Sequence, residues 1–263
     1  MPTITLEKDN LDERNKEFAQ VPLKESLFLN SVPKCGTHLI RNIMRMFVPV
    51  EQHYKTEFIQ IARFAQHKAA FDPKAPKLSW GHLLFDDEPA IAMRDVRKIL
   101  LVRDPYDWVL ARARFYLSEN FDGKVENIKD GAVTIEALLN MMIFGVYRKV
   151  PSLEETFRHN GAAWMGANTY LIRYEELVEA VKALGTPASD RYFGELFDAC
   201  GIALPADWRE RVKIGSDRKQ SSTARENLKP SPVKVPDELP DIQKQLVDYA
   251  SPGLRKLLGY ALR

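Results

Sequence analysis

The sequence of 263 residues is short of several features, and each shortage excludes a kind of protein. Its two cysteines, Cys35 and Cys200, lie far apart and form no metal-binding spacing, so we expect two free thiols in a reduced compartment. No apolar stretch reaches the length of about 18 residues that a membrane-spanning helix needs. The net charge of +2 is too small to indicate nucleic acid or a membrane surface as a partner.

The remaining composition is that of a globular protein with a core, because 45% of the residues are hydrophobic and 28% are charged. No internal repeat, low-complexity tract or shift in composition divides the chain. We therefore expect one domain over residues 1–263. Residues 1–17 are polar and charged and contain no apolar core of a signal peptide, and residues 1–25 are expected to form an exposed lead-in to the first strand.

Short apolar runs alternate with longer amphipathic segments along the chain. Three runs have the character of buried strands, at residues 27–32, 98–102 and 168–173. This alternation predicts an α/β fold, a single domain with a central parallel sheet flanked by helices. Residues 215–236 are expected to be irregular. Helices are expected from Thr37 to Phe47 and over residues 55–70, 88–97, 106–117, 134–148, 152–164, 175–184, 190–199, 206–212, 241–249 and 253–260.

The first strand is followed by a tight loop and a helix, in the segment Ser26–Phe47. The break at Pro33–Gly36 comes directly before Thr37, where apolar residues begin to recur at offsets of three and four. Such a loop gathers backbone N–H groups at a helix N-terminus, which carries about half a positive charge. With Lys34 and the Thr37 hydroxyl in the same place, the segment predicts an anion site, most naturally for a phosphate.

This loop differs from the Walker A loop of nucleotide hydrolases and kinases. That loop needs G-x-x-x-x-G-K-[ST], with a hydroxyl for Mg²⁺ directly after the Lys. Here Lys34 precedes Gly36, and the first Gly of the motif is missing. The alternative without function is an ordinary strand-to-helix turn that happens to contain a Lys and a Gly.

A second motif, ILLVRDPYDW, covers Ile99–Trp108 and places Arg103 directly after a strand. In open α/β sheets, ligands bind beyond the carboxyl ends of the strands. The guanidinium group suits bidentate binding of a phosphate. The structural alternative is an ion pair between Arg103 and either Asp104 or Asp107.

Both motifs resemble those of one enzyme family. P-K-x-G-T at Pro33–Thr37 is similar to the 5′-phosphosulfate loop of the sulfotransferases that use 3′-phosphoadenosine 5′-phosphosulfate (PAPS), and R-[ND]-P-x-D at Arg103 is similar to their 3′-phosphate motif. The two stand in the family's order. The resemblance implies a P-loop-like sulfotransferase fold, PAPS as donor, 3′-phosphoadenosine 5′-phosphate (PAP) as product, and no metal.

The resemblance also assigns residues to the donor. Arg103 would hold the 3′-phosphate, although the Ser that the family places eight residues later is Ala111 here, with Arg112 and Arg114 beside it. Leu39 stands where cytosolic members often have a Trp that stacks on adenine. The 5′-phosphate would be held by Pro33, Lys34, Cys35, Gly36, Thr37 and His38.

The catalytic base implied by the resemblance is His82, which stands 21 residues before Arg103 in SWGHLLF. An imidazole suits proton removal near neutral pH because its unperturbed pKa is about 6.5. The alternative is a His that is hydrogen-bonded in a packed turn. We expect the remaining histidines, His53, His67 and His159, at the surface.

Two weaker matches complete the resemblance. LIRYEEL is similar to the family's S-Y-E-D-L and maps Tyr174 to the neighbourhood of the adenine. Arg218 and Lys219 match the start of the family's C-terminal R-K-G loop, which would make residues 215–236 a candidate nucleotide lid; a plain solvated loop is the alternative.

The sequence thus predicts in-line transfer of a sulfuryl group from PAPS to a hydroxyl or amine, with Lys34 and His82 as catalytic residues. The acceptor stays open among a small molecule, a lipid, a glycan and a peptidyl group. Two rival functions are a catalytically inactive adenine-nucleotide-binding module of the same fold and a P-loop kinase or nucleotide hydrolase, which has only Asp104 in its favour. Family members that act in the Golgi lumen usually carry an N-terminal anchor. Residues 1–25 have no apolar stretch of that kind, so we expect a cytoplasmic protein. The sequence predicts no oligomeric state.

Overall fold

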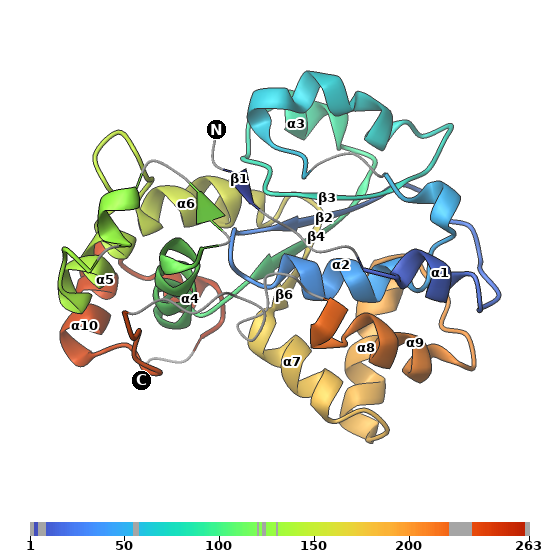
Figure 1. The fold of residues 1–263 in the computed structure, drawn as a ribbon. Coiled ribbons are helices and arrows are strands. Elements are labelled where there is room, and N and C mark those ends of the chain that lie inside the picture. Colours follow the sequence, from blue (N-terminus) through green and yellow to red (C-terminus); the bar gives the residue numbers. More distant parts are fainter. Residues whose placement is uncertain are drawn as a thin grey trace. The chain divides into compact units, whose positions relative to one another are not determined.

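The computed structural model describes residues 3–4, 9–54, 58–119, 121–122, 125–129, 131–220 and 233–260. The chain divides into two compact units (Figure 1). The sheet unit comprises Lys8–Val102 and His159–Ser221, and the helical unit comprises Met1–Glu7, Arg103–Arg158 and Ser222–Arg263. The single domain expected over residues 1–263 stays a prediction.

Four parallel strands form the centre of the sheet unit, in the order β3-β2-β4-β6 (Figure 1). Every position of β2 is buried, as expected of a central strand in a parallel sheet. The predicted α/β fold with a central parallel sheet is confirmed, as are its three predicted strands. The strand bounds are β2 Leu27–Ser31, β3 Leu78–Gly81, β4 Arg97–Val102 and β6 Thr169–Arg173.

Helices of the sheet unit follow the strands in the expected alternation. The helix α2, Thr37–Arg45, packs against β2, β3 and α9. The backbones of α2 and α9 approach closely, since a Cβ atom on Gly215 of α9 would lie 2.6 Å from the Cα of Ile43 in α2. The other described helices of this unit are α1 Leu11–Asn15, α3 Asp87–Ala92, α7 Tyr174–Lys182, α8 Pro187–Ala199 and α9 Trp208–Gly215, with the 3-10 helices η1 Val50–Gln52, η4 Ala162–Trp164 and η5 Arg218–Gln220.

The α-helix expected over residues 55–70 is instead a 3-10 helix, η2, over Ile61–Phe71; residues 55–57 lie outside the described chain. Its buried residues include Phe64, His67 and Ala70, which recur every third position, as the three-residue turn of a 3-10 helix requires. Ala65 and Ala69, whose spacing in the sequence is that of one α-helical face, are exposed.

The helical unit packs α4, Pro105–Leu117, against α5 and α10. Asp104 caps α4 by accepting a hydrogen bond from the Tyr106 N–H at 3.0 Å, and Pro105 occupies the first turn as predicted. In the described part of the chain, no helix is both long and apolar enough to cross a membrane. The remaining elements are β1 Thr3–Ile4, paired antiparallel with β5 Phe121–Asp122, η3 Glu126–Ile128, α5 Ile135–Phe144, most of α6 Leu153–Asn160, α10 Asp241–Ala250 and α11 Leu254–Leu257.

Candidate active site

The loop between β2 and α2, residues 32–36, has an unusual backbone. Both Lys34 (φ 71°) and Gly36 (φ 98°) adopt the left-handed conformation, which is rare for a residue such as Lys. Gly36 is the N-cap of α2, and no side chain of the described residues caps this helix. The N–H groups of Thr37 and His38, the first two of α2, therefore keep their hydrogen-bonding capacity beside the positive end of the helix dipole, as in an anion-binding loop.

Tyr174 is packed against this loop. It is the first residue of α7, directly after β6, and a Cβ atom on Gly36 would lie 2.4 Å from its Cδ2. Only a glycine fits between the loop backbone and this ring. The structure thus brings Tyr174 to the phosphate-loop candidate; its predicted contact with adenine stays a prediction.

Burial lowers the pKa of Lys34 to about 7, with the neighbouring Cys35 thiol acting in the opposite direction. Burial disfavours the charged form of the Lys34 side chain, whereas a nearby negative charge favours it. An anion placed in the loop would therefore raise the pKa of Lys34 and hold it charged. This is the electrostatic behaviour expected of a lysine that binds a phosphate.

His82 emerges directly after β3, and the register Asn30↔Gly81 brings it beside the end of β2. Its Nδ1 lies 2.9 Å from the backbone oxygen of Ser31, which can only accept a hydrogen bond. Nδ1 therefore carries the proton, and the neutral ring has its lone pair on Nε2. The geometry thus holds the imidazole in a single tautomer whose Nε2 can accept a proton.

Burial is also the main cause of a low pKa at His82, which falls to about 4; the hydrogen bond to Ser31 acts upward and the charge of Lys34 downward. The ring is stacked on Phe58, with centroids 5.2 Å apart and an angle of 23° between the planes. The ring centroid of His38 lies 5.5 Å from that of the same Phe58, with the two planes tilted by 45°. The pKa of His38 is held well below the usual value by burial and by the charges of Arg41 and Lys34. Both imidazoles are therefore neutral at neutral pH.

A cluster of buried amides fixes the residue after His82. Asn30 accepts from the Leu83 N–H at 3.0 Å and donates to the Leu83 carbonyl at 3.2 Å. The same carbonyl accepts hydrogen bonds from Asn160 at 3.1 Å and from the Trp164 indole at 2.8 Å. Nothing in the sequence pattern marked these residues, because their roles depend on how β2 and β3 are paired.

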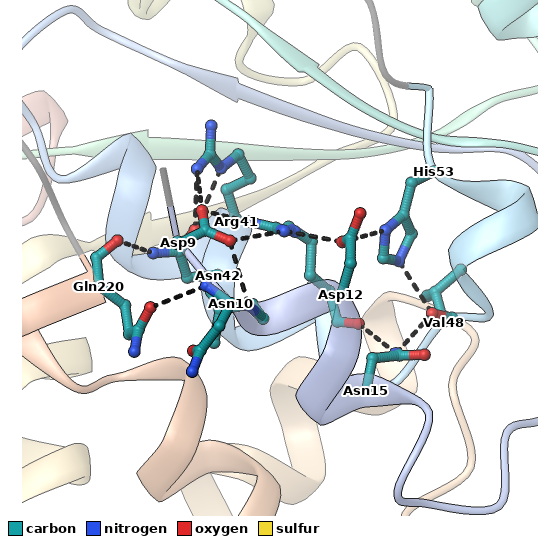
Figure 2. Close-up of polar contacts among 11 residues, drawn as sticks. Asp9, Asn10, Asp12, Asn15, Arg41, Asn42, Val48, His53 and Gln220 are labelled. Carbon is teal, nitrogen blue, oxygen red and sulfur yellow. Dashed lines mark hydrogen bonds and ion pairs between the residues drawn. The ribbon is translucent and has the colours of Figure 1, made fainter. Parts of the chain in front are cut away.

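The far end of α2 is held by a second polar network (Figure 2). Arg45 donates to both oxygens of Asp9, at 2.7 and 2.9 Å, and to Asp12 at 2.7 Å. His53 lies 3.5 Å from the same Asp12 and is buried. The surface position predicted for His53 is wrong, and so is that of His67, which is buried with its Nδ1 3.1 Å from the Tyr54 hydroxyl. His159 is exposed, as expected.

Arg218 and Lys219 belong to η5 and are exposed. The following residue, Gln220, accepts a hydrogen bond from Asn42 of α2 at 3.1 Å (Figure 2), which ties this segment to the helix of the loop. The irregular segment begins later than predicted, because α9 continues to Gly215 and η5 follows. Most of the candidate lid, residues 221–232, lies outside the described chain.

Arg103 directly follows Val102, the last residue of β4, and is the first residue of its segment of the helical unit. Of the two arginines beside Ala111, Arg112 is buried and donates to the carbonyls of Met142 and Pro151, at 3.0 and 2.7 Å. Arg112 is therefore engaged in holding α5 and the segment after it. Arg114 likewise donates to the carbonyl of Pro236.

The described residues contain no cluster of His, Cys, Asp and Glu that could hold a metal ion. Neither Cys35 nor Cys200 forms a disulfide, as expected, and both are buried. Chemically, the site in the sheet unit combines a cradle for an anion, a lysine whose charge an anion would stabilise, and an imidazole with an available lone pair on Nε2.

Two solved structures share the arrangement of the chain. A mouse sulfotransferase, SULT7A1, solved with PAP, matches 96% of this chain and 93% of its own, with a TM-score of 0.55 and 16% identity. A retinol dehydratase, solved with androsterone and the inactive cofactor PAP, matches 92% of this chain and 83% of its own, with a TM-score of 0.50 and 14% identity. No protein-family model matches the chain, and no curated protein sequence does.

Proposed function

We propose that this chain, which has the sulfotransferase fold, transfers a sulfuryl group from PAPS to a hydroxyl or amine of an acceptor. The observation that carries the proposal is the meeting of two groups in one unit. The anion-binding loop of Lys34 follows β2, and the imidazole of His82 follows the adjacent strand β3. Ser31, at the end of β2, contacts both Thr37 and the His82 ring. Both neighbours with this fold were solved with PAP, the product of PAPS.

In the proposed reaction, the bond between sulfur and the 5′-phosphate oxygen breaks as a bond between sulfur and the acceptor oxygen or nitrogen forms. His82 takes the acceptor proton on Nε2. Lys34, the first amides of α2 and Thr37 stabilise the charge that develops on the leaving phosphate oxygen. Because these groups are fixed before the reaction, little reorganisation is needed in the transition state.

The remaining assignments rest on the family resemblance. For Arg103 we propose the 3′-phosphate, and for Tyr174 the adenine. For Arg218 and Lys219 we propose a lid that contacts the nucleotide. Pro33, Cys35 and His38 would complete the loop around the 5′-phosphate. We also propose one domain for the whole chain and a cytoplasmic location.

We propose that the acceptor presents a hydroxyl or an amine to the site. The retinol dehydratase structure holds androsterone, a small hydroxylated molecule. For this chain a small molecule, a lipid alcohol, a glycan and a peptidyl hydroxyl are all candidates. A panel with one member of each class therefore belongs in any assay of activity.

The experiment combines PAP binding with transfer of ³⁵S from labelled PAPS to the acceptor panel. We expect PAP to bind and a labelled product to form, with formation lost in His82→Ala. Binding of PAP with no product from any acceptor favours the inactive nucleotide-binding module. Ala111 and Leu39, which depart from the family's Ser and Trp, are consistent with such a module. Binding of Mg²⁺–ATP in preference to PAP favours the kinase or nucleotide hydrolase.

A further inference from the structure

Three side chains form a row between the anion-binding loop and the candidate base. The Ser31 Oγ lies 2.6 Å from the Thr37 Oγ1 and 3.2 Å from the His82 Nδ1. Ser31 is the last residue of β2 and is fully buried. Thr37 is the first residue of α2 and is also buried. Ser31 therefore contacts both the loop hydroxyl and the imidazole.

The direction of the hydrogen bonds along this row follows from one fixed point. The backbone oxygen of Ser31 can only accept, so the His82 Nδ1 at 2.9 Å must be a donor. The Ser31 Oγ then faces an N–H group and accepts from it. Its own proton has one remaining partner among the described residues, the Thr37 Oγ1.

The consequence falls on Thr37. Since its Oγ1 accepts the proton of Ser31, the Thr37 hydroxyl cannot donate back along the row. No other acceptor for this hydroxyl is present among the described residues, and its proton is available to an anion in the loop. A phosphate offers only acceptors, so a Thr that donates outward is the arrangement that binds it.

We propose that Ser31 is a positioning residue that turns the Thr37 hydroxyl proton toward the donor's 5′-phosphate. This inference rests on the proposed function, because it takes the loop ligand to be the 5′-phosphate of PAPS and PAP. Ser31 itself does not touch the donor; it acts through Thr37. The same hydroxyl accepts from His82, so one buried side chain is shared by the donor site and the base.

The test is a double-mutant cycle on PAP affinity, measured by calorimetry with the full chain. Thr37→Val should weaken PAP binding about 10- to 100-fold, as expected for a lost hydrogen bond to a charged group. Ser31→Ala should weaken it about 3- to 10-fold, because the Thr37 proton is no longer oriented. In the Thr37→Val background, Ser31→Ala should change the affinity by less than about twofold, since there is no hydroxyl left to orient.

Ser79 provides a matched control. It is a fully buried serine on the adjacent strand β3, and its Oγ has no hydrogen-bond partner among the described residues. Ser79→Ala should leave PAP affinity unchanged, which separates the proposed role from the general effect of removing a buried hydroxyl. If Ser31→Ala does not fold, Ser31→Cys takes its place, because a thiol keeps the volume and is a weak donor.

Each outcome decides between the two proposals. Equal losses from the Ser31 substitution in both backgrounds would overturn the positioning role, and so would an unchanged affinity in Ser31→Ala. In either case the wild-type protein still binds PAP, and the proposed function stands. Failure of the wild-type protein to bind PAP overturns the proposed function and the role of Ser31 with it.

Discussion

A Cβ atom on Gly36 would lie 2.4 Å from the Cδ2 of Tyr174, closer than any side chain can approach a ring. Gly36 also has a φ of 98°, which an L-residue adopts only with strain. Two separate physical demands thus require glycine at the N-cap of α2. The same contact joins the end of β6 to the loop that follows β2.

Gly36→Ala should therefore cost more than backbone strain alone. Gly185→Ala is the matched control, because Gly185 has a similar φ of 93° with nothing within 4 Å of its Cβ position. We expect Gly185→Ala to lower the free energy of unfolding by about 1–2 kcal/mol and to leave PAP affinity unchanged. Gly36→Ala should lose more stability, and PAP affinity as well. Equal stability losses in chemical denaturation, with PAP affinity intact, would refute the role given to the Tyr174 contact.

The pH dependence of kcat/KM for PAPS should report the two perturbed groups in the free enzyme. Burial lowers the pKa of His82 to about 4, so the base stays neutral until the pH falls through that value. Lys34 has a pKa lowered to about 7 and loses its charge as the pH rises through it. We expect a bell-shaped profile with limbs near these two values. An acidic limb near the ordinary His pKa of about 6.5 would contradict the buried environment of His82.

Breaking the buried ion pair between Asp104 and Arg255 should destabilise the helical unit more than breaking an exposed pair does. Both residues are buried, and the guanidinium donates to both carboxylate oxygens, at 3.0 and 2.8 Å. Arg255→Met leaves the Asp104 charge buried without this partner and should cost about 3–5 kcal/mol in chemical denaturation. Arg158 is the control, since its side chain is exposed and its partner Glu154 is only partly buried, and Arg158→Met should cost no more than about 1 kcal/mol. Similar losses in both variants would show that the buried pair has no special role.

Much of the fold could be predicted from local sequence. The strands at Leu27, Lys98 and Thr169 are short apolar runs, and the α2 N-terminus follows a break that contains Pro33 and Gly36. These signals lie within a few residues of the elements they specify. The α-helix expected over residues 55–70 was wrong because a 3-10 helix buries every third residue, a pattern that the alanines of this segment obscure.

The supporting residues of the site could not be predicted in this way. Ser31 and Asn30 act on His82 and Leu83, about fifty residues away, only because β2 and β3 are adjacent and parallel. Strand order is not written in any one segment. The burial of His53 also depends on residues distant in the sequence, because His53 packs beside Asp12 of α1. Both segments are polar, and neither one alone indicates a buried position.

Lys34→Ala should reduce turnover more than it reduces PAP affinity. Charge on the leaving phosphate oxygen grows in the transition state, so the ammonium group contributes more there than in the bound product. We expect turnover to fall on the order of 10²-fold. Lys213→Ala, at an exposed position of α9, is the control and should match the wild-type protein. Turnover that is unchanged in Lys34→Ala would remove the loop from the mechanism.

The central claim is that the chain binds a 3′-phosphorylated adenine nucleotide, and calorimetric titration of the wild-type protein with PAP and with adenosine 5′-phosphate tests it most directly. A charge-assisted contact from Arg103 to the 3′-phosphate is expected to contribute about 1.5–3 kcal/mol. We predict that PAP binds at least about tenfold more tightly than adenosine 5′-phosphate, and that Arg103→Ala narrows this difference. Equal affinity of the wild-type protein for the two nucleotides, or no binding of PAP, would contradict the account.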